Sequence, residues 1–414
     1  MQTDSGTAPM PPDGRRKKIL FMAEAVTLAH VGRPLALAAS LPPARYDVHF
    51  ACAPGYEFCF VHSDFPVWPI RSIASVQFLR ALATGSPVYD EATLERYIED
   101  DMLLLNKLRP DLVIGDFRLS LSASARLARV PYVALVNAYW SPYAHQRYTV
   151  PNLPMTHVLP IPLANWLFRR VAPYAFRRHT VPLNRVRHTF GLPPLEADLR
   201  RIYTDGDYTW YADLPTLVPV HDLPPTHSYL GPVIWSPPLA PPDWWATLPE
   251  HVSVVYVTLG SSGQGQLLPL VLHALASLPL TVVAATAANI TLAQLPPNAR
   301  VAPFLPGELA ARRAALVICN GGSPTSHQAL QAGVPVIGIA SNLDQFLNMD
   351  GISAAGAGIT LRADRFNQAA LQQAVMTMLE QPAARLAAQT LAAQCIQFNA
   401  LERLPVLLTS VLKR

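Results

Sequence analysis

Residues 315–349, ALVICNGGSPTSHQALQAGVPVIGIASNLDQFLNM, alternate between two kinds of pattern. Two short apolar segments, ALVIC and VPVIGI, each end near a turn of small or polar residues. Between them, PTSHQALQAG has the spacing of a helix. Nearly continuous apolar strands that alternate with helices are typical of parallel sheets covered on both faces. The stretch therefore predicts a strand–helix–strand unit of a doubly wound α/β domain.

The same alternation extends over most of the chain, in two series. A proline-rich segment at residues 231–249, GPVIWSPPLAPPDWWATLP, separates them, because its prolines cannot extend either series. We expect an α/β protein with two doubly wound domains, at residues 17–235 and 236–390, and one or two helices at 391–414. Strands are expected at residues 17–22, 46–52, 111–117 and 131–136 in the first domain, and at 252–260, 280–287, 300–305, 315–319, 334–339 and 358–362 in the second.

The composition fits a protein of this kind. A chain of 414 residues suits two domains of ordinary size, and 50% hydrophobic against 14% charged residues excludes a disordered chain. The net charge of +4 is spread over the whole length, which argues against a nucleic-acid partner. The four cysteines show no zinc-type spacing. We interpret them as buried free thiols in a reducing compartment, which predicts a cytoplasmic protein.

Two segments need a test for membrane targeting. The basic residues 15–18 precede an apolar run, as in a signal peptide, but the run soon reaches Glu24 and has no small-residue cleavage site. We therefore expect a disordered tail at residues 1–16 that leads into the first strand. Residues 267–288 carry no formal charge and are long enough to span a bilayer. Because Pro279 interrupts them, and the first half is rich in Leu and Ala whereas the second is β-branched, they predict a helix followed by a strand.

Ligands of open parallel sheets bind at the carboxyl ends of the strands, and three turns of the second series carry suitable residues there. The first, at residues 260–263, is GSSG, and the second, at 320–326, is NGGSPTS. Both place backbone N–H groups and hydroxyls at a helix start, which fits either an anion site or a tight turn. At the third turn, Asp344 and Gln345 fit either a helix cap or a site for sugar hydroxyls.

The wider stretch at residues 300–349, RVAPFLPGELAARRAALVICNGGSPTSHQALQAGVPVIGIASNLDQFLNM, resembles the donor-binding signature of the family 1 glycosyltransferases, with the bacterial natural-product branch closest. These members of the UDP-glycosyltransferase superfamily have two facing doubly wound, Rossmann-like domains, the GT-B architecture. The resemblance implies that residues 17–235 bind the acceptor and that 236–390 bind the nucleotide sugar. It also implies that a C-terminal helix at 391–414 packs back on the first domain.

The resemblance assigns donor-binding residues by position. Two positions depart from the family pattern: Asn320 stands where a histidine usually binds the diphosphate, and Gln328 where a glutamate usually binds the ribose hydroxyls. Both amides can form hydrogen bonds but bring no charge, which implies a weaker grip on the nucleotide. The implied set comprises Phe304 and Leu305 beside the base, Ser261, Ser262, Asn320, Gly321, Gly322, Ser323, Thr325 and Ser326 around the diphosphate, Gln328 at the ribose, and Asp344 and Gln345 at the sugar.

A catalytic base is expected in the first domain. His30 lies in the loop after the first strand, just before a helix, and Asp116 ends another strand at the same sheet edge. The resemblance matches His30 to the family's histidine that deprotonates an acceptor hydroxyl, and Asp116 to the aspartate that orients it. This pairing suits general base catalysis, because the carboxylate fixes the tautomer of the imidazole. On spacing alone, an ordinary capping histidine is the alternative.

The predicted activity is inverting transfer of a sugar from a UDP- or dTDP-linked donor to a hydroxyl of a small hydrophobic acceptor, without a metal or a cofactor. The alternatives are a catalytically impaired sugar-nucleotide-binding protein and a nucleotide-sugar epimerase or hydrolase of the same fold. We expect a monomer or a weak dimer.

Residues 157–190 leave two interpretations open. One is a helical excursion that lines the acceptor pocket, with its arginines in solvent. The other is a face that meets an anionic membrane peripherally to reach a lipid acceptor. The segment combines aromatic residues with Arg169, Arg170, Arg177, Arg178, Arg185 and Arg187.

Overall fold

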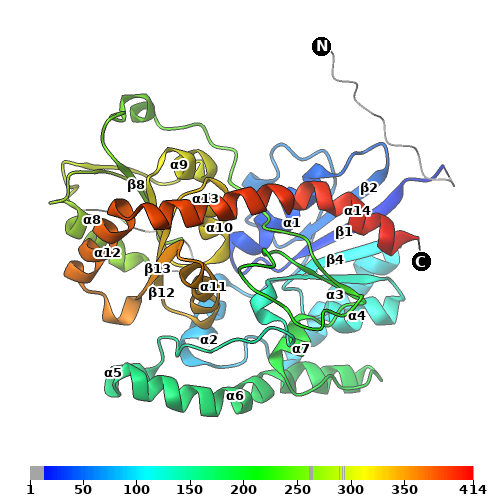
Figure 1. Cartoon of the computed structure of the whole chain (residues 1–414). Helices are drawn as coiled ribbons and strands as arrows, with labels where there is room; N and C mark the ends of the chain where they lie inside the picture. The colour runs from blue at the N-terminus through cyan, green and yellow to red at the C-terminus, as the bar shows by residue number, and fades with distance from the viewer. Residues whose placement is uncertain (1–13, 261–263, 289, 291, 293, 414) are drawn as a thin grey trace.

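A computed structural model describes residues 14–260, 264–288, 290, 292 and 294–413 of the chain. Within this part, the named strands form two sheets, each the centre of one domain, and every named strand pairs in parallel with its neighbours. The two domains lie side by side (Figure 1). The prediction of two doubly wound domains is confirmed. Residues 1–13 of the predicted tail lie outside the described residues.

The first sheet has the strand order β3-β2-β1-β4-β5-β6-β7. Successive residues of β1 point to opposite faces, so that Ile19 and Phe21 pack against α1, whereas Leu20 and Met22 pack against α3 and α4. The strands are β1 (Lys17–Ala23), β2 (Tyr46–Cys52), β3 (Val67–Pro69), β4 (Leu112–Asp116), β5 (Tyr132–Val136), β6 (Tyr208–Tyr211) and β7 (His227–Tyr229). The helices are α1 (Leu28–Ser40), α2 (Ser75–Thr84), α3 (Glu91–Leu108), α4 (Leu121–Ala128), α5 (Pro154–Val158), α6 (Ile161–Thr189) and α7 (Leu199–Tyr203).

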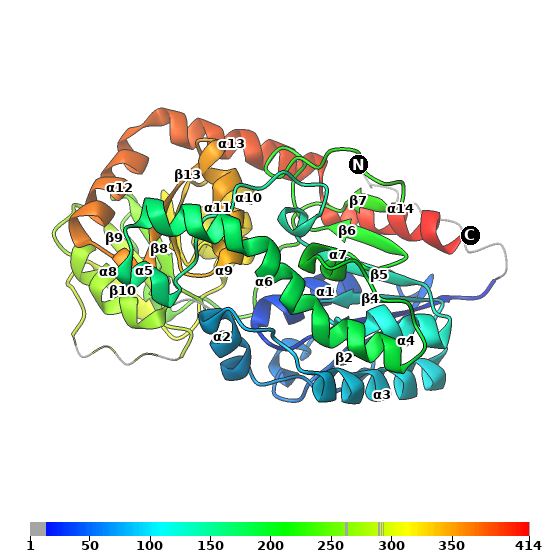
Figure 2. The same ribbon diagram turned by 90° about the horizontal axis from the view of Figure 1, so that it is seen from below.

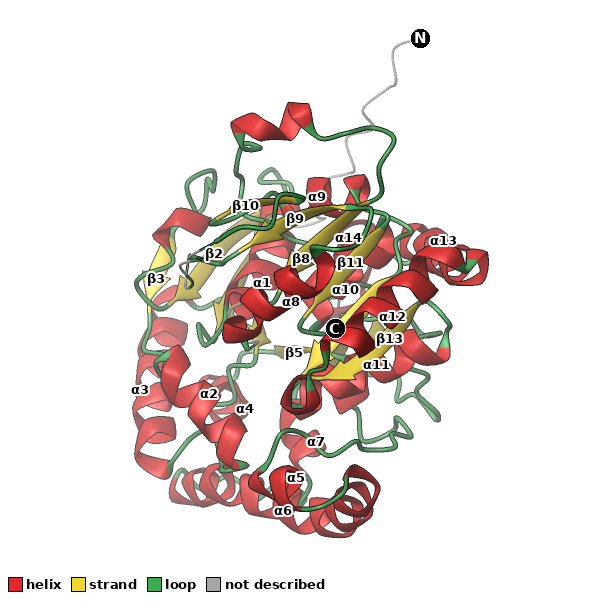
Figure 3. Cartoon of the chain, turned by 90° about the vertical axis from the view of Figure 1, so that its left-hand side faces the viewer, coloured by secondary structure: helices red, strands yellow, loops and turns green. Residues whose placement is uncertain are grey.

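The second sheet has the strand order β10-β9-β8-β11-β12-β13. Val255 and Val257 of β8 pack toward α8 and α12, and Val254 and Tyr256 toward the opposite face. Figure 3 shows the strands of both sheets between their flanking helices. The strands are β8 (Val254–Thr258), β9 (Thr281–Ala285), β10 (Ala299–Ala302), β11 (Leu316–Cys319), β12 (Val336–Ala340) and β13 (Gly358–Arg362). The helices are α8 (Leu268–Leu275), α9 (Gly307–Arg313), α10 (Ser323–Gln331), α11 (Leu343–Ala354), α12 (Gln368–Glu380), α13 (Pro382–Gln397) and α14 (Ala400–Leu412).

Each segment expected to be a strand contains one, but β3, β6 and β7 were not expected. These three strands have only three or four residues, and β3 contains Pro69 and is largely exposed, so none gives a recognisable apolar pattern. Residues 267–288 fold into α8 and then β9, as predicted. None of the helices in the described residues combines the length and the apolar character that crossing a bilayer requires. The four cysteines are free and buried.

The C-terminal helices connect the two domains. α13 packs against α10 of the second domain, and α14 packs against α1 of the first. Arg403 of α14 also donates to the carbonyl oxygen of Tyr229 at 2.8 Å. The return to the first domain therefore begins at Ala400, later than the predicted start at residue 391, because Leu391 and Cys395 of α13 still belong to the core beside the second sheet. Figure 1 shows the two helices, in red, running across both domains.

The segment from Val150 to α6 also joins the domains. Backbone Asn152 donates to the carbonyl oxygen of Ser341 at 2.7 Å, and the hydroxyl of Thr156 in α5 donates to Asp364 at 2.7 Å. The long helix α6 follows and extends beneath both domains (Figure 2). The two domains are therefore held together on two sides, by α13 and α14 on one and by α5 and α6 on another.

Candidate functional site

The two residues of the predicted base meet at the carboxyl edge of the first sheet. β1 and β4 are neighbours, and their register pairs Ala23 with Asp116, the last residue of each strand. The loop after β1 therefore passes Asp116 and places His30, in the first turn of α1, beside it. Nδ1 of His30 lies 2.7 Å from Oδ1 of Asp116. Since the carboxylate accepts this hydrogen bond, Nδ1 carries the proton and the lone pair of Nε2 is left for a substrate.

Arg33 is a second partner of Asp116, which the sequence did not reveal. Its Nε donates to Oδ2 of Asp116 at 3.0 Å and its Nη2 to Oδ1 at 2.8 Å. Arg33 and His30 are three residues apart, so they lie on the same face of α1. Burial opposes the ionisation of Asp116, but Arg33 and His30 outweigh it and hold the pKa of Asp116 below its usual value. Asp116 is therefore an anion at neutral pH.

A chain of hydrogen bonds continues from Arg33 toward the second domain. Nη1 of Arg33 donates to Asn137 at 2.6 Å, and Nδ2 of Asn137 donates to Asp213 at 3.1 Å. Nε2 of His327 in α10 lies 3.5 Å from Oδ1 of Asp213. Burial raises the pKa of Asp213 to about 6 and lowers the pKa of His327 to about 3, so His327 is neutral near pH 7. The hydrogen bonds therefore run from Arg33 to Asp213, and His327 of α10 packs beside their end without a hydrogen bond at Nε2 from any described residue.

Phe117 and Arg118 fix the turn that follows Asp116. The ring of Phe117 stacks on His30, with the ring centroids 4.9 Å apart and an angle of 17° between the ring planes. Phe117 has a φ of 57°, a left-handed value that is rare for a bulky residue. The buried guanidinium of Arg118 forms ion pairs of 2.9 Å with both Glu24 and Asp101, which anchors the turn in this conformation.

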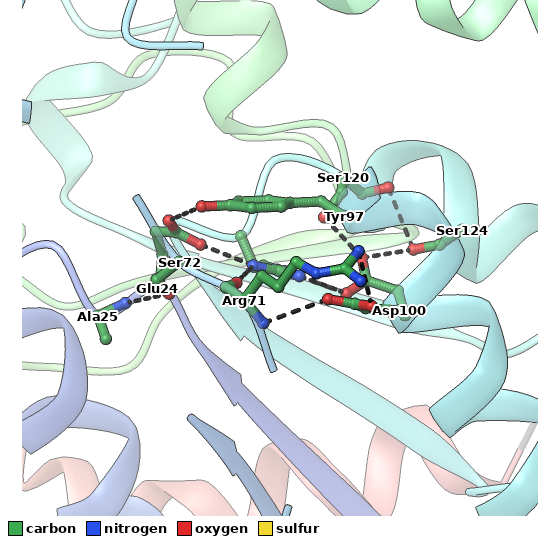
Figure 4. Close-up of polar contacts among 10 residues, drawn as sticks. Glu24, Ala25, Arg71, Ser72, Tyr97, Asp100, Ser120 and Ser124 are labelled. Atoms are coloured by element: carbon green, nitrogen blue, oxygen red, sulfur yellow. Dashed lines mark hydrogen bonds and ion pairs between the residues drawn. The ribbon is translucent and has the colours of Figure 1, made fainter. Parts of the chain in front are cut away.

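Further hydrogen bonds surround this ion cluster (Figure 4). The hydroxyl of Tyr97 donates to Glu24 at 2.8 Å, and backbone Ala25 donates to the hydroxyl of Ser72 at 3.0 Å. Burial raises the pKa of Glu24, although Arg118 opposes this effect. The cluster holds the start of the loop that carries His30, so it supports the site without facing the cleft.

A cavity of about 140 Å³ lies in front of His30, between the two domains. Its walls on the side of the first domain are mainly apolar and aromatic, apart from the polar group around His30. Its walls on the side of the second domain are the turn before α10 and the start of α11. The residues that matter below are Phe78, Leu82, Trp140 and Tyr203 from the first domain, and Gly322, Ser323, Asp344 and Gln345 from the second.

Asp344 reaches across the domain boundary. Its Oδ1 accepts a hydrogen bond of 2.8 Å from Nε1 of Trp140. The helix cap of α11 is instead a capping box formed by Asn342 and Gln345. The side chain of Asn342 accepts a hydrogen bond from the backbone N–H of Gln345, and the side chain of Gln345 accepts one from the backbone N–H of Asn342. The interpretation as a cap therefore applies to Gln345 and not to Asp344. Contact of either side chain with a donor sugar stays a prediction.

A second cavity, of about 490 Å³, adjoins the first along the edge of the second sheet. Phe304 is 43% exposed and lines it with Leu305 and Thr325, and contact of these residues with a nucleotide stays a prediction. Gly322 and Pro324 line both cavities, so the two cavities lie next to each other at the turn before α10. Ser261 and Ser262 lie outside the described residues.

Asn320, Gly321 and Ser326 shape this turn. Oδ1 of Asn320 accepts a hydrogen bond of 3.0 Å from backbone Gly322. Gly321 has a φ of 80°, and a Cβ there would lie 2.9 Å from a carbon of Met349, so only glycine fits. The hydroxyl of Ser326 is fully buried and donates to the carbonyl oxygen of Gly322 at 3.0 Å. Neither Gly321 nor Ser326 lines either of these two cavities, and their contact with a donor stays a prediction.

Gln328 faces the linker between the domains. Its Nε2 donates to the carbonyl oxygen of Trp235 at 2.7 Å and to the hydroxyl of Ser236 at 2.9 Å. A carbonyl oxygen can only accept, so this contact needs an amide and would be lost with a carboxylate. The departure from the family pattern at this position therefore has a structural reason in the linker.

We expect Gln328→Glu to lower the free energy of unfolding by about 1–3 kcal/mol, because a buried acceptor would then face a buried carbonyl oxygen. Urea denaturation at pH 8, where the new carboxyl is ionised, measures the change. Gln331→Glu, the same replacement at an exposed position of α10, is the control and should change stability little. Equal changes in the two variants would contradict the role given to Gln328.

Residues 157–190 do not line the cavity beside His30. Phe176 of α6 contacts Trp140, with ring centroids 6.3 Å apart, and Trp140 in turn forms part of the cavity wall. Trp140 therefore stands between α6 and this cavity, and the interpretation of the segment as a lining of the acceptor pocket stays a prediction.

Comparisons with known proteins agree with this architecture. A family model for the C-terminal domain of proteins like erythromycin biosynthesis protein CIII matches residues 269–399. A PGL/p-HBAD biosynthesis glycosyltransferase of Mycobacterium tuberculosis (strain ATCC 25177 / H37Ra) is 50% identical over 394 residues, which cover 94% of this chain and 92% of the relative. A PGL/p-HBAD biosynthesis rhamnosyltransferase of Mycobacterium bovis (strain BCG / Pasteur 1173P2) is 52% identical over 378 residues, which cover 91% of this chain and 84% of the relative.

Solved structures with the same fold are more distant in sequence. The spinosyn forosaminyltransferase SpnP superposes with a TM-score of 0.71 at 19% identity, covering 96% of this chain and all of that chain (100%). The glycosyltransferase VinC in complex with dTDP superposes with a TM-score of 0.68 at 19% identity, covering 96% of this chain and 100% of that chain. These likenesses show the shared GT-B fold.

Proposed function

Because this chain belongs to the family 1 glycosyltransferases, like its mycobacterial relatives, we propose that it transfers a hexose from a nucleotide sugar. The proposed donor nucleotide is of the thymidine type, and the proposed acceptor group is a hydroxyl of a small hydrophobic molecule. The transfer inverts the anomeric centre. The observation that carries the proposal is the cavity in which His30, held by Asp116, faces the turn before α10 and Asp344.

The proposed reaction is a single displacement. Nε2 of His30 takes the proton of the acceptor hydroxyl as the hydroxyl oxygen attacks the anomeric carbon. The bond between that carbon and the diphosphate oxygen breaks, and its electron pair leaves with the nucleoside diphosphate. The N-terminus of α10, with the backbone N–H groups near Gly322 and Ser323, stabilises the charge on the leaving diphosphate. Asp116 keeps Nδ1 of His30 protonated throughout, so that His30 accepts the substrate proton only at Nε2.

The character of the acceptor follows from the cavity walls. Phe78, Leu82, Trp140 and Tyr203 present apolar and aromatic surface to the side of the cavity nearest His30. A hydroxyl carried by an aromatic or aliphatic body would bury apolar area there and place its oxygen at the base. The name of the M. bovis relative supports rhamnose as the sugar.

The proposed preference for a thymidine-type donor rests on Gln328. Its amide donates hydrogen bonds to Trp235 and Ser236, and the position has no carboxylate that could accept a hydrogen bond from a ribose 2′-hydroxyl. A donor that lacks this hydroxyl therefore loses little. The dTDP complex of VinC, a protein of the same fold, is consistent with such a donor.

The test is a turnover assay with dTDP-rhamnose and UDP-rhamnose against a panel of phenols and long-chain alcohols, read by mass spectrometry and by the anomeric coupling of the product. We expect inverted glycosides, with kcat/KM for dTDP-rhamnose at least equal to that for UDP-rhamnose. A preference of a hundredfold or more for UDP-rhamnose would refute the interpretation of Gln328. Donor binding without any transfer would favour the impaired binding protein, and release of free sugar or an epimer would favour the hydrolase or epimerase.

A further inference from the structure

The outer side of α6 carries an exposed surface that the reaction does not use. One stripe of the helix is buried, with Ala164, Phe168, Ala172 and Phe176 against the body of the protein. The opposite stripe faces solvent. We name this stripe the basic helix face, and it consists of Leu163, Trp166, Arg170, Tyr174, Arg177 and Arg178.

The basic helix face also carries exposed apolar and aromatic side chains. Trp166 is 55% exposed, Tyr174 is 74% exposed and Leu163 is 47% exposed. Val158, at the end of the neighbouring helix α5, is 82% exposed. Large apolar side chains so exposed in one stretch of helix indicate a surface that is covered by a partner.

The charge on this helix has one sign. The 29 residues of α6 contain six arginines and no aspartate or glutamate. Two of the six pair with carboxylates of the protein: Arg185 lies 2.7 Å from Glu91 at the surface, and the buried Arg187 lies 3.4 Å from Asp205. By contrast, no carboxylate among the described residues pairs with Arg170, Arg177 or Arg178. The guanidinium of Arg170 instead lies over the ring of Trp166, 5.3 Å from its centroid.

We propose that the basic helix face docks on an anionic lipid surface. Unpaired arginines attract anionic headgroups, while tryptophan, tyrosine and aliphatic side chains beside them insert at the boundary of headgroups and acyl chains. A nucleic-acid partner would also pair with these arginines, but it would not bury the exposed apolar side chains of Val158 and Leu163. The combination of unpaired arginines with exposed apolar residues therefore favours lipid.

The position of the face relative to the cavity is consistent with this proposal. α2 lies beside α6 on the same side of the molecule (Figure 2), and Nε2 of His179 in α6 lies 3.2 Å from the carbonyl oxygen of Gly85 at the end of α2. Phe78 and Leu82 of α2 line the cavity beside His30. A docked molecule would therefore hold its acceptor cavity close to the lipid, an implication that rests on the proposed function. The docking itself does not rest on it.

The test uses the full chain and sucrose-loaded vesicles, without donor or acceptor. We expect sedimentation with vesicles of equal parts phosphatidylglycerol and phosphatidylcholine in 0.1 M NaCl, and not with phosphatidylcholine alone. The variant Arg170→Gln/Arg177→Gln/Arg178→Gln should bind at least tenfold more weakly, since each basic residue near the surface contributes roughly fivefold. The control Arg300→Gln/Arg312→Gln/Arg385→Gln removes the same charge from exposed positions of the second domain and should bind like the wild type.

A second measurement tests insertion of the aromatic end. Brominated lipids in the same vesicles should quench part of the tryptophan fluorescence of the wild type, and Trp166→Phe should lose most of that quenching. Equal losses of binding in the two triple variants, absence of binding to the anionic vesicles, or equal quenching with and without Trp166 would overturn the proposal. Binding of duplex DNA that falls in the same triple variant, without vesicle binding, would reassign the face to nucleic acid. None of these outcomes changes the expected result of the turnover assay, so lipid docking and the proposed function can be refuted separately.

Discussion

Alanine in place of His30 is expected to lower kcat for transfer to a hydroxyl acceptor by roughly 10²–10⁴-fold, the usual contribution of a positioned general base. His30 presents Nε2 to the cavity because Nδ1 is engaged by Asp116 at 2.7 Å. Asp344, another carboxylate in the cavity wall, accepts a hydrogen bond from Nε1 of Trp140 at its Oδ1. The dissociation constant for the nucleotide donor should change little, since His30 does not line the cavity proposed to hold the donor.

The expected loss in kcat for His30→Ala depends on the acidity of the acceptor hydroxyl. An acceptor such as 4-nitrophenol is largely ionised at pH 8 without help, so it needs the base less than an alkyl alcohol does. The loss in kcat for His30→Ala should therefore be small with 4-nitrophenol and full with octanol. Calorimetric titration with dTDP gives the donor affinity, and His62→Ala, at an exposed position, is the matched control. A uniform loss with both acceptors would point to a structural defect, and transfer to octanol within a few-fold of wild type would refute the assignment.

The placement of the base could be predicted because it depends on a rule of parallel sheets. Residues that end strands lie at one edge, and the register pairs Ala23 of β1 with Asp116 of β4. The fold was equally accessible, because strands buried on both faces produce apolar runs that stand out in the sequence. Short edge strands such as β3, with three residues and a proline, produce no such run.

The contacts of single side chains were less accessible. Gln328 looks like a weakened ribose ligand in the sequence, but its partners Trp235 and Ser236 are more than ninety residues away, and only the folded linker brings them there. Ser326 resembles a phosphate ligand, yet its hydroxyl bonds back to the carbonyl oxygen of Gly322 one turn earlier. Arg33 had a signal in principle, since it lies one helical turn after His30. An arginine on a helix face has many possible partners, and only the β1–β4 register selects Asp116.

Replacing Asp116 by asparagine is expected to damage both activity and stability, through different partners. Toward His30, the amide can present an N–H group to Nδ1, which would favour the opposite tautomer and protonate Nε2. We expect kcat to fall by roughly 10²–10⁴-fold for this reason. Toward Arg33, the variant removes the carboxylate that accepts two hydrogen bonds from its guanidinium, and Arg33 is only 6% exposed. A buried charge that loses its partner should cost about 3–5 kcal/mol of stability.

A second substitution separates the two effects. In Asp116→Asn/Arg33→Met, the unpaired buried charge of Arg33 is removed, and an unbranched apolar side chain occupies much the same space. Urea denaturation of this double variant should therefore show that most of the lost stability is restored. The activity should stay low, because the methionine does nothing for the tautomer of His30. Recovery of kcat together with stability would mean that Asp116 serves only to neutralise Arg33. Failure of the double variant to regain stability would mean that Arg33 is held mainly by Asn137, to which it donates at 2.6 Å, and not by the carboxylate.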